Sequence, residues 1–158
     1  MAFRPVSLPA DVPGALWLSS MPGHIEPWAS FEAEAARTRL AQVVCLTPRS
    51  ELAQLSPAYD DAVSEGTVTF VWRHLPMRNF GLPDDGPGFR HEVQRIADAL
   101  RRGDAVLLHC AAGIGRTGTA AACILKALGL SSDDSLQRVS DAGSNPQNAQ
   151  QSGLVDWF

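Results

Sequence analysis

The sequence has few cysteines, no cluster of basic residues and no long apolar run. Its three cysteines, Cys45, Cys110 and Cys123, are odd in number and far apart, which argues against a disulfide framework and against a zinc cluster. No apolar run approaches the length of a membrane span, and residues 1–7 lack the continuous apolar stretch of a secretory signal. We therefore expect a protein of a reducing compartment, with a cytoplasmic location and no membrane partner.

The charge balance argues against a nucleic-acid partner. The net charge is −4, from 13 basic and 17 acidic residues, and Lys and Arg are spread along the chain. The sequence therefore predicts no nucleic-acid partner. An anion must be held by a local arrangement of donors, because the overall field does not favour anions.

Hydrophobic periodicity predicts alternating strands and helices in a chain whose 158 residues fit one domain. The alternation indicates a single α/β domain over residues 1–158, in which a central, mostly parallel sheet of four to five strands is flanked by helices on both faces. Strands are expected at 15–18, 42–46, 67–72 and 105–109, helices at 27–40, 56–65, 89–100, 116–128, 131–142 and 146–158, and loops at 76–88 and 110–115.

The segment 109–118 has the pattern of a phosphate-binding loop between a strand and a helix. Cys110 follows the most apolar strand of the chain, and Arg116 comes six positions later, at the predicted start of a helix. Small residues and two glycines between them allow successive backbone N–H groups to converge on one point. Such a nest at a helix N-terminus binds a dianionic oxyanion. The residues expected to form it are Ala111, Ala112, Gly113, Ile114, Gly115 and Arg116.

These residue types suit a reaction at phosphorus. Converging amides and the helix N-terminus favour the thiolate form of Cys110, a nucleophile that can form a phosphocysteine intermediate. Arg116 can bind two phosphate oxygens at once, a geometry that lysine does not match. The hydroxyl of Thr117 is placed to donate to the sulfur and make it a better leaving group. We expect no metal and no cofactor.

The segment resembles the signature of the protein tyrosine phosphatase superfamily, which is a Cys, five residues, an Arg and then Ser/Thr-Gly. The chain length and the stretch 43–52 resemble the compact dual-specificity branch, particularly the kinase-associated phosphatases. The resemblance implies a hydrolase of the tyrosine or dual-specificity type that acts on phosphotyrosine in proteins, on phosphoserine or phosphothreonine, and on aryl phosphates. It also implies inhibition by phosphate, sulfate or vanadate. The loop 111–115 lacks the lysines of phosphoinositide phosphatases, which disfavours a lipid substrate.

The resemblance also suggests supporting residues. In the superfamily, the histidine before the nucleophile orients the loop. In this sequence that histidine is His109. A glutamine loop near the C-terminus positions the water that hydrolyses the phosphoenzyme. The run 147–151 resembles that loop, and either Gln147 or Gln151 is the candidate.

The general acid departs from the family pattern. The superfamily places an Asp in a motif like Trp-Pro-Asp-Phe-Gly-Val-Pro, and residues 77–83 match it with Asn79 at the acid position. An amide cannot deliver a proton, so a contribution of roughly 10²–10⁴ in rate would be missing. Three explanations stay open. In the first, the acid is displaced to Asp84, which we prefer to Asp85. In the second, the protein is a weakly active or inactive phosphate-binding pseudophosphatase. In the third, Asn79 is an engineered trap.

Overall fold

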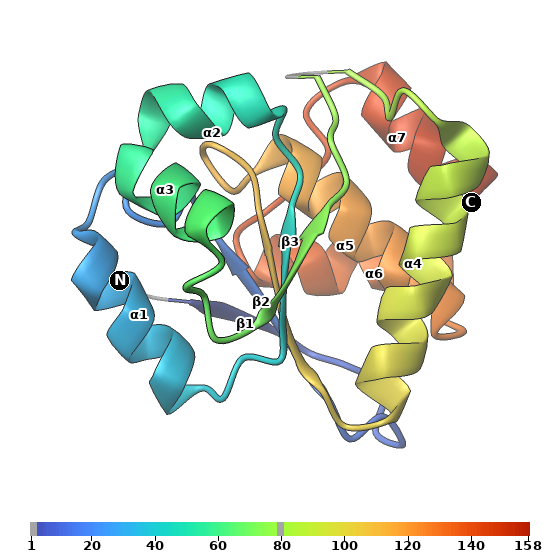
Figure 1. Ribbon diagram of the computed structural model, residues 1–158. Helices are drawn as coiled ribbons and strands as arrows, with labels where there is room; N and C mark the ends of the chain where they lie inside the picture. Colours follow the sequence, from blue (N-terminus) through green and yellow to red (C-terminus); the bar gives the residue numbers. More distant parts are fainter. Residues whose placement is uncertain (1–2, 79–80) are drawn as a thin grey trace.

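A five-stranded sheet lies at the centre of the computed structural model, which describes residues 3–78 and 81–158 (Figure 1). The strand order is β1-β2-β5-β3-β4, and only the β1–β2 pair is antiparallel. This confirms the predicted α/β domain with a mostly parallel sheet. The strands are β1 (Arg4–Val6), β2 (Ala15–Ser19), β3 (Gln42–Cys45), β4 (Val71–His74) and β5 (Ala105–His109).

Helices cover both faces of the sheet (Figure 1). One face carries α1 (Trp28–Arg37), α2 (Arg49–Leu55) and α3 (Pro57–Glu65). The other face carries α4 (Gly86–Arg101), α5 (Gly115–Ala127), α6 (Ser132–Asp141) and α7 (Ala149–Trp157).

The central strand β5 is apolar at its first four positions because both of its faces are covered. Val106 and Leu108 pack in the larger core with α4 and α5, while Leu107 points to the opposite face and packs with Phe31 of α1. Successive side chains of a strand alternate between faces, so a strand covered on both sides is apolar throughout. Because β5 is buried on both faces, its packing fixes the position from which the loop after it begins.

Two elements were not predicted, and several bounds differ from those predicted, among them the starts of β4 and α4. β1 was missed because three residues containing Pro5 carry no periodicity, and its pairing with β2 decides it. α2 was missed because it has seven residues and directly precedes α3. β4 begins at Val71, four residues later than expected, since it pairs with β3 from that point while Phe70 turns into the core. α4 begins at Gly86, three residues early, because the Asp85 carboxylate accepts a hydrogen bond from the N–H of Gly88 and caps the helix.

The parallel strands β3, β4 and β5 end at one edge of the sheet, where the predicted phosphate-binding loop follows β5. Ligand sites of open parallel sheets lie at this edge. Among residues 3–78 and 81–158, no helix has the length and apolar character needed to cross a membrane.

Candidate active site

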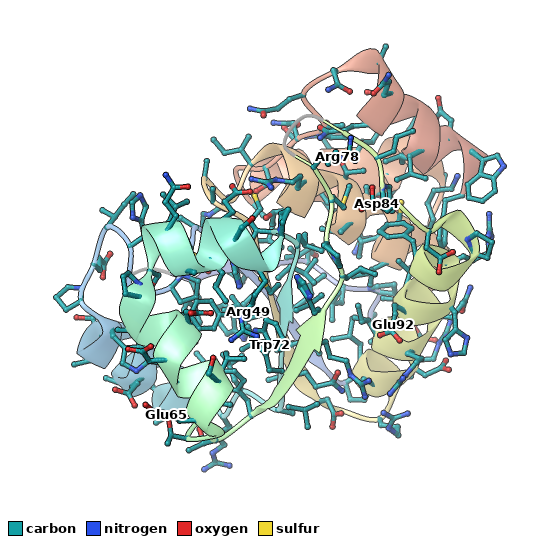
Figure 2. The ribbon with its side chains drawn as sticks, turned by 45° about the horizontal axis from the view of Figure 1, so that its top comes forward. Arg49, Glu65, Trp72, Arg78, Asp84 and Glu92 are labelled. Carbon is teal, nitrogen blue, oxygen red and sulfur yellow. The ribbon has the colours of Figure 1, made fainter. Side chains whose placement is uncertain are left out.

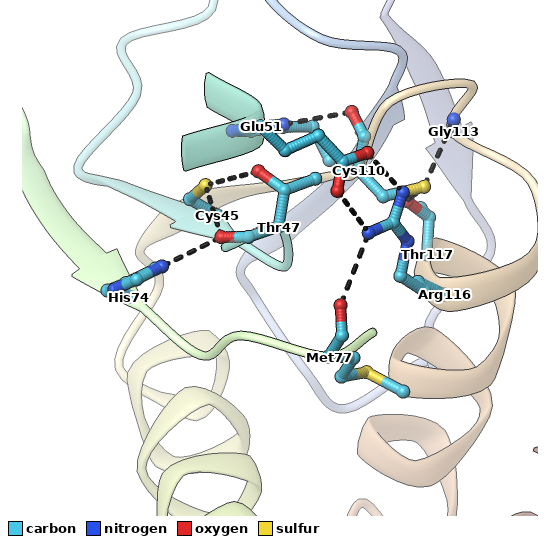
Figure 3. A network of polar contacts seen from close by, with 10 residues as sticks. Cys45, Thr47, Glu51, His74, Met77, Cys110, Gly113, Arg116 and Thr117 are labelled. Carbon is cyan, nitrogen blue, oxygen red and sulfur yellow. Dashed lines mark hydrogen bonds and ion pairs between the residues drawn. The ribbon is translucent and has the colours of Figure 1, made fainter. Parts of the chain in front are cut away.

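The loop after β5 curls around the sulfur of Cys110. The N–H of Gly113 donates to Sγ at 3.2 Å and the hydroxyl of Thr117 donates to it at 3.0 Å (Figure 3). α5 begins at Gly115, so the sulfur also faces the N-terminus of a 13-residue helix. Hydrogen-bond donors and the positive end of the helix dipole both stabilise negative charge on sulfur.

Close backbone packing forces this loop shape. Gly113 has a φ of +76°, and a Cβ atom there would lie 2.5 Å from the carbonyl oxygen of Ser19. The next segment is also tied to the loop, because the N–H of Met21 donates to the Ala111 carbonyl at 3.0 Å. Only glycine fits such a position. The small residues of the signature therefore serve a steric purpose that the sequence pattern indicated.

Arg116 lies beside Cys110 and is held by a carboxylate from a distant part of the chain. Its Nη1 and Nη2 donate to the two oxygens of Glu51, at 3.0 and 2.8 Å, and Nη1 also donates to the Met77 carbonyl at 3.2 Å (Figure 3). Burial opposes the charge of the guanidinium, but the hydrogen bonds and negative charges of Glu51 and Cys110 prevail and raise the pKa of Arg116.

These contacts orient the remaining donors of Arg116. They use three of the five N–H groups of the guanidinium, including both on Nη1. The other two are the Nε–H and one Nη2–H, which lie parallel on one edge of the planar group. Two parallel donors match two oxygens of a phosphate group.

Glu51 is a site residue that the sequence analysis did not single out, although it lies in the stretch that carries the family resemblance. Its helix, α2, follows Pro48, which occupies the N-cap position. An acidic residue in the first turn of a helix usually interacts favourably with the helix dipole. The local sequence pattern therefore already explains a glutamate at position 51. Its contact with Arg116 depends on the fold.

His109 belongs to a buried hydrogen-bonded chain behind the loop. Its Nε2 lies 2.7 Å from the Tyr59 hydroxyl, which accepts from the indole N–H of Trp72, and its Nδ1 lies 3.2 Å from the Cys110 carbonyl. Burial lowers the pKa of His109 to about 4, so the ring is neutral at pH 7. A carbonyl only accepts, hence Nδ1 carries the proton and Tyr59 donates to Nε2.

The two candidate glutamines lie in different environments. The side chain of Gln147 covers the start of α5, where a Cβ atom on Gly115 would be 2.7 Å from its Oε1. Gln151 is fully buried, and its Oε1 accepts from the backbone N–H of Gln147 at 2.8 Å. Within the described part of the chain, Nε2 of Gln151 has no hydrogen-bond partner. Gln147 therefore borders the phosphate-binding loop, and Gln151 holds the backbone of Gln147 in place.

Comparison with known proteins identifies the family. A family model described as Swiss Army Knife protein, DSP-PTPase phosphatase domain, matches residues 12–152. The chain belongs to this phosphatase family. The predicted resemblance to the compact dual-specificity branch of the protein tyrosine phosphatase superfamily is thereby confirmed.

Solved structures of phosphatases share the fold. One is kinase associated phosphatase with serine in place of its catalytic-site cysteine, with a TM-score of 0.83 and 19% identity over 98% of this chain and 92% of that chain. PTPMT1 has a TM-score of 0.73 and 16% identity over 99% of this chain and 93% of that chain. Tk-PTP in its active form has a TM-score of 0.69 and 24% identity over 94% and 95% of the two chains. At these identities the likeness shows the fold of the phosphatase.

The candidates for the general acid lie on the segment between β4 and α4. Asn79 falls outside the described residues. Asp84 is exposed, and its Oδ1 is 3.8 Å from Nε of the exposed Arg78 (Figure 2). Asp84 also lines, with Phe89 and residues of β4 and α4, an open cavity of about 290 Å³. The Asp85 carboxylate caps α4. The structure thus places Asp84 beside α4, without a contact to the loop among the described residues.

The other two cysteines of the phosphatase are buried thiols. Burial raises the pKa of Cys123 to about 12 and also raises the pKa of Cys45, whose sulfur contacts the hydroxyl of Thr47 at 3.2 Å. Buried neutral thiols are poor nucleophiles. Among the three cysteines, only Cys110 lies at the N-terminus of a helix with two donors on its sulfur.

Proposed function

We propose that this phosphatase hydrolyses phosphotyrosine in proteins and small aryl phosphates through a phosphocysteine on Cys110, with phosphoserine and phosphothreonine as further substrates and residues 1–158 as one phosphatase domain. The observation that carries the proposal is the pair of donors on the Cys110 sulfur, at 3.0 and 3.2 Å, at the N-terminus of α5. Donors of this kind stabilise negative charge on sulfur, and a thiolate is the form of cysteine that attacks phosphorus.

The geometry supports a reaction in two steps. In the first, the thiolate of Cys110 forms a bond to phosphorus as the bond to the ester oxygen breaks, and the leaving alcohol or phenol takes up a proton. In the second, water attacks phosphorus and gives its proton to the carboxylate that protonated the leaving group, while the sulfur leaves as thiolate, assisted by the Thr117 hydroxyl. Arg116 binds two phosphate oxygens in both steps through its Nε and Nη2 edge, which Glu51 orients. Gln147 positions the water.

We assign the general acid to Asp84. Asp85 is committed to the N-terminus of α4, where its carboxylate accepts a hydrogen bond from Gly88 at 3.0 Å. Asp84 is 71% exposed, and among the described residues its carboxylate has one ion-pair partner, the exposed Arg78, at 3.8 Å. Because the Asp84 side chain is exposed, its displacement toward Cys110 would uncover no buried group, and closure over substrate is common among enzymes. An acid that must move also favours substrates whose leaving group needs little protonation, namely aryl phosphates.

The loop composition bears on the substrate class. PTPMT1, which shares this fold, has a structure in complex with PI(5)P. Residues 111–115 of this chain are all neutral, and the basic residue of the signature is Arg116. A phosphoinositide headgroup carries further negative charges that a neutral loop does not balance. We therefore place phosphotyrosine ahead of lipid phosphate.

The test compares wild type with Cys110→Ser on p-nitrophenyl phosphate, a phosphotyrosine peptide and PI(5)P. Wild type should turn over the two aryl substrates and form a covalent phosphoenzyme that acid quenching traps, and Cys110→Ser should bind phosphate without turnover. If wild type hydrolyses none of the substrates faster than Cys110→Ser does, the protein is a phosphate-binding pseudophosphatase. Faster hydrolysis of PI(5)P than of the peptide would reverse the substrate order.

A further inference from the structure

Arg4, at the start of β1, reaches the phosphate-binding loop from the opposite end of the sequence. Its Nη2 donates to the Gly113 carbonyl at 2.6 Å, and its Nη1 donates to the Ala142 carbonyl and the Ser144 hydroxyl, at 2.7 and 2.9 Å. The Ser144 hydroxyl donates in turn to the same Gly113 carbonyl at 2.6 Å. Two donors therefore converge on one carbonyl oxygen of the loop.

The position of that carbonyl fixes the next amide. A trans peptide is planar, so the N–H of Ile114 points opposite to the Gly113 carbonyl and away from Arg4. The Gly113 N–H, on the preceding peptide, donates to the Cys110 sulfur. An amide in a phosphate nest is useful only if it faces the anion, and rotation of this peptide would present a carbonyl oxygen instead.

Arg4 also ties the loop to the segment that leads to Gln147. The segment 142–145 carries the two other acceptors of Arg4, and the N–H of Asn145 donates to the Ile114 carbonyl at 3.2 Å. Gly143 has a φ of +89°, which favours glycine, and a Cβ atom there would lie 3.0 Å from Nη1 of Arg4. Burial lowers the pKa of Arg4, and negative charge on Cys110 opposes that effect. The guanidinium thus stays charged close to the site.

We infer that Arg4 is a positioning residue, which holds the Gly113–Ile114 peptide so that the Ile114 amide faces the bound phosphate. The inference rests on the proposed function only in identifying the loop as the phosphate site. It concerns a residue far from the signature, which contacts the back of the loop and not the substrate.

The experiment measures the dissociation constant of inorganic phosphate by calorimetry, and kcat and KM for p-nitrophenyl phosphate, below the unfolding temperature of each variant. Arg4→Met should raise the phosphate dissociation constant about tenfold, as expected for one lost hydrogen bond to a charged group. kcat/KM should fall by a similar factor, because the amide binds ground state and transition state alike. Arg4→Lys, which keeps one cationic donor, should recover part of the loss.

Arg138→Met is the matched control, because Arg138 ties the same N-terminal segment to α6 by donating to the Ser7 carbonyl at 3.1 Å. It should bind phosphate as wild type does. An equal loss of affinity in Arg138→Met and Arg4→Met, or wild-type affinity in folded Arg4→Met, overturns the inference. If Arg4→Met does not fold, Arg4→Gln decides, since it removes the guanidinium donors but keeps a polar side chain, and it should weaken phosphate binding. Wild-type affinity in that variant also overturns it.

The two proposals fail in different ways. A wild type that binds phosphate but hydrolyses no substrate refutes the proposed function, and the phosphate dissociation constants of the Arg4 variants still decide the inference. A wild type that does not bind phosphate refutes both.

Discussion

Glu51 holds the guanidinium of Arg116 through two hydrogen bonds, of 2.8 and 3.0 Å, across 65 positions of sequence. The Arg116 side chain is 2% exposed and that of Glu51 is 25% exposed. The carboxylate both compensates the buried charge and fixes the rotation of the guanidinium. Its placement therefore affects stability and phosphate binding together.

We expect Glu51→Gln to lower kcat/KM for p-nitrophenyl phosphate by about tenfold and the free energy of unfolding by about 1–3 kcal/mol. The amide retains one acceptor, but its NH₂ group faces a guanidinium N–H and leaves a buried donor unpaired. Enzyme kinetics and urea unfolding measure the two effects. Glu65→Gln, a change at an exposed residue of α3, should alter neither. Full activity in Glu51→Gln would show that Arg116 is oriented by other contacts.

Thr117 tests the second step of the reaction. Thr117→Val keeps the shape of the side chain and removes the donor that lies 3.0 Å from the Cys110 sulfur. A sulfur that loses this donor is a poorer leaving group, so breakdown of the phosphoenzyme should slow by about ten- to a hundredfold. Rapid-mixing kinetics should show a burst of p-nitrophenol followed by slow turnover.

Thr119→Val is the control, because Thr119 is buried on the same helix and donates to the Gly115 carbonyl at 2.7 Å. It removes a hydroxyl of the same kind without touching the sulfur. A burst of equal size in both variants would assign the effect to α5 as a whole.

The acid assignment predicts different results for the two neighbouring aspartates. Asp84→Asn should lower kcat by about 10²-fold, with a smaller loss for a substrate whose phenol is more acidic. Asp85→Ala should lower the stability by about 1 kcal/mol through loss of the α4 cap. Asn79→Asp should raise kcat if the family position of the acid is vacant. Wild-type kcat in Asp84→Asn would exclude Asp84 as the acid.

The part of the site that could be predicted from the sequence is the part that is contiguous in it. Cys110, Arg116 and Thr117 lie within eight residues between a strand and a helix, so their spacing determines their relative positions. Glu51 and Arg4 act on this loop from 65 and 109 positions away. Only the packing of α2 and β1 against the rest of the fold brings them there.

The same distinction holds for the secondary structure. The buried strand β5 and the long helix α4 follow from periodicity, while β1 exists only through its pairing with β2. The choice between Gln147 and Gln151 was open because both lie in one amide-rich run. We favour Gln147 for this role, since α7 buries Gln151 and leaves Gln147 beside Gly115.

His109 makes the stability of the protein depend on pH. Its pKa is about 4 in the fold because burial penalises the charged ring, and the ordinary value is 6.5. As the pH falls below about 6.5, the unfolded chain takes up a proton that the folded one does not accept until about pH 4. The free energy of unfolding should therefore fall over this range, by up to about 3 kcal/mol, and this contribution should level off below it.

Urea unfolding of wild type and His109→Gln at several pH values isolates the contribution from that of the carboxyl groups. The variant lacks the titrating ring, so its stability should depend less on pH, and the difference between the two proteins should shrink as the pH falls from about 7 to about 4. His91→Gln changes an exposed histidine of α4 and serves as the control. At each pH its free energy of unfolding should exceed that of His109→Gln by as much as that of wild type does. A constant gap between wild type and His109→Gln across the range would mean that the folded protein accepts a proton at His109 as readily as the unfolded chain does.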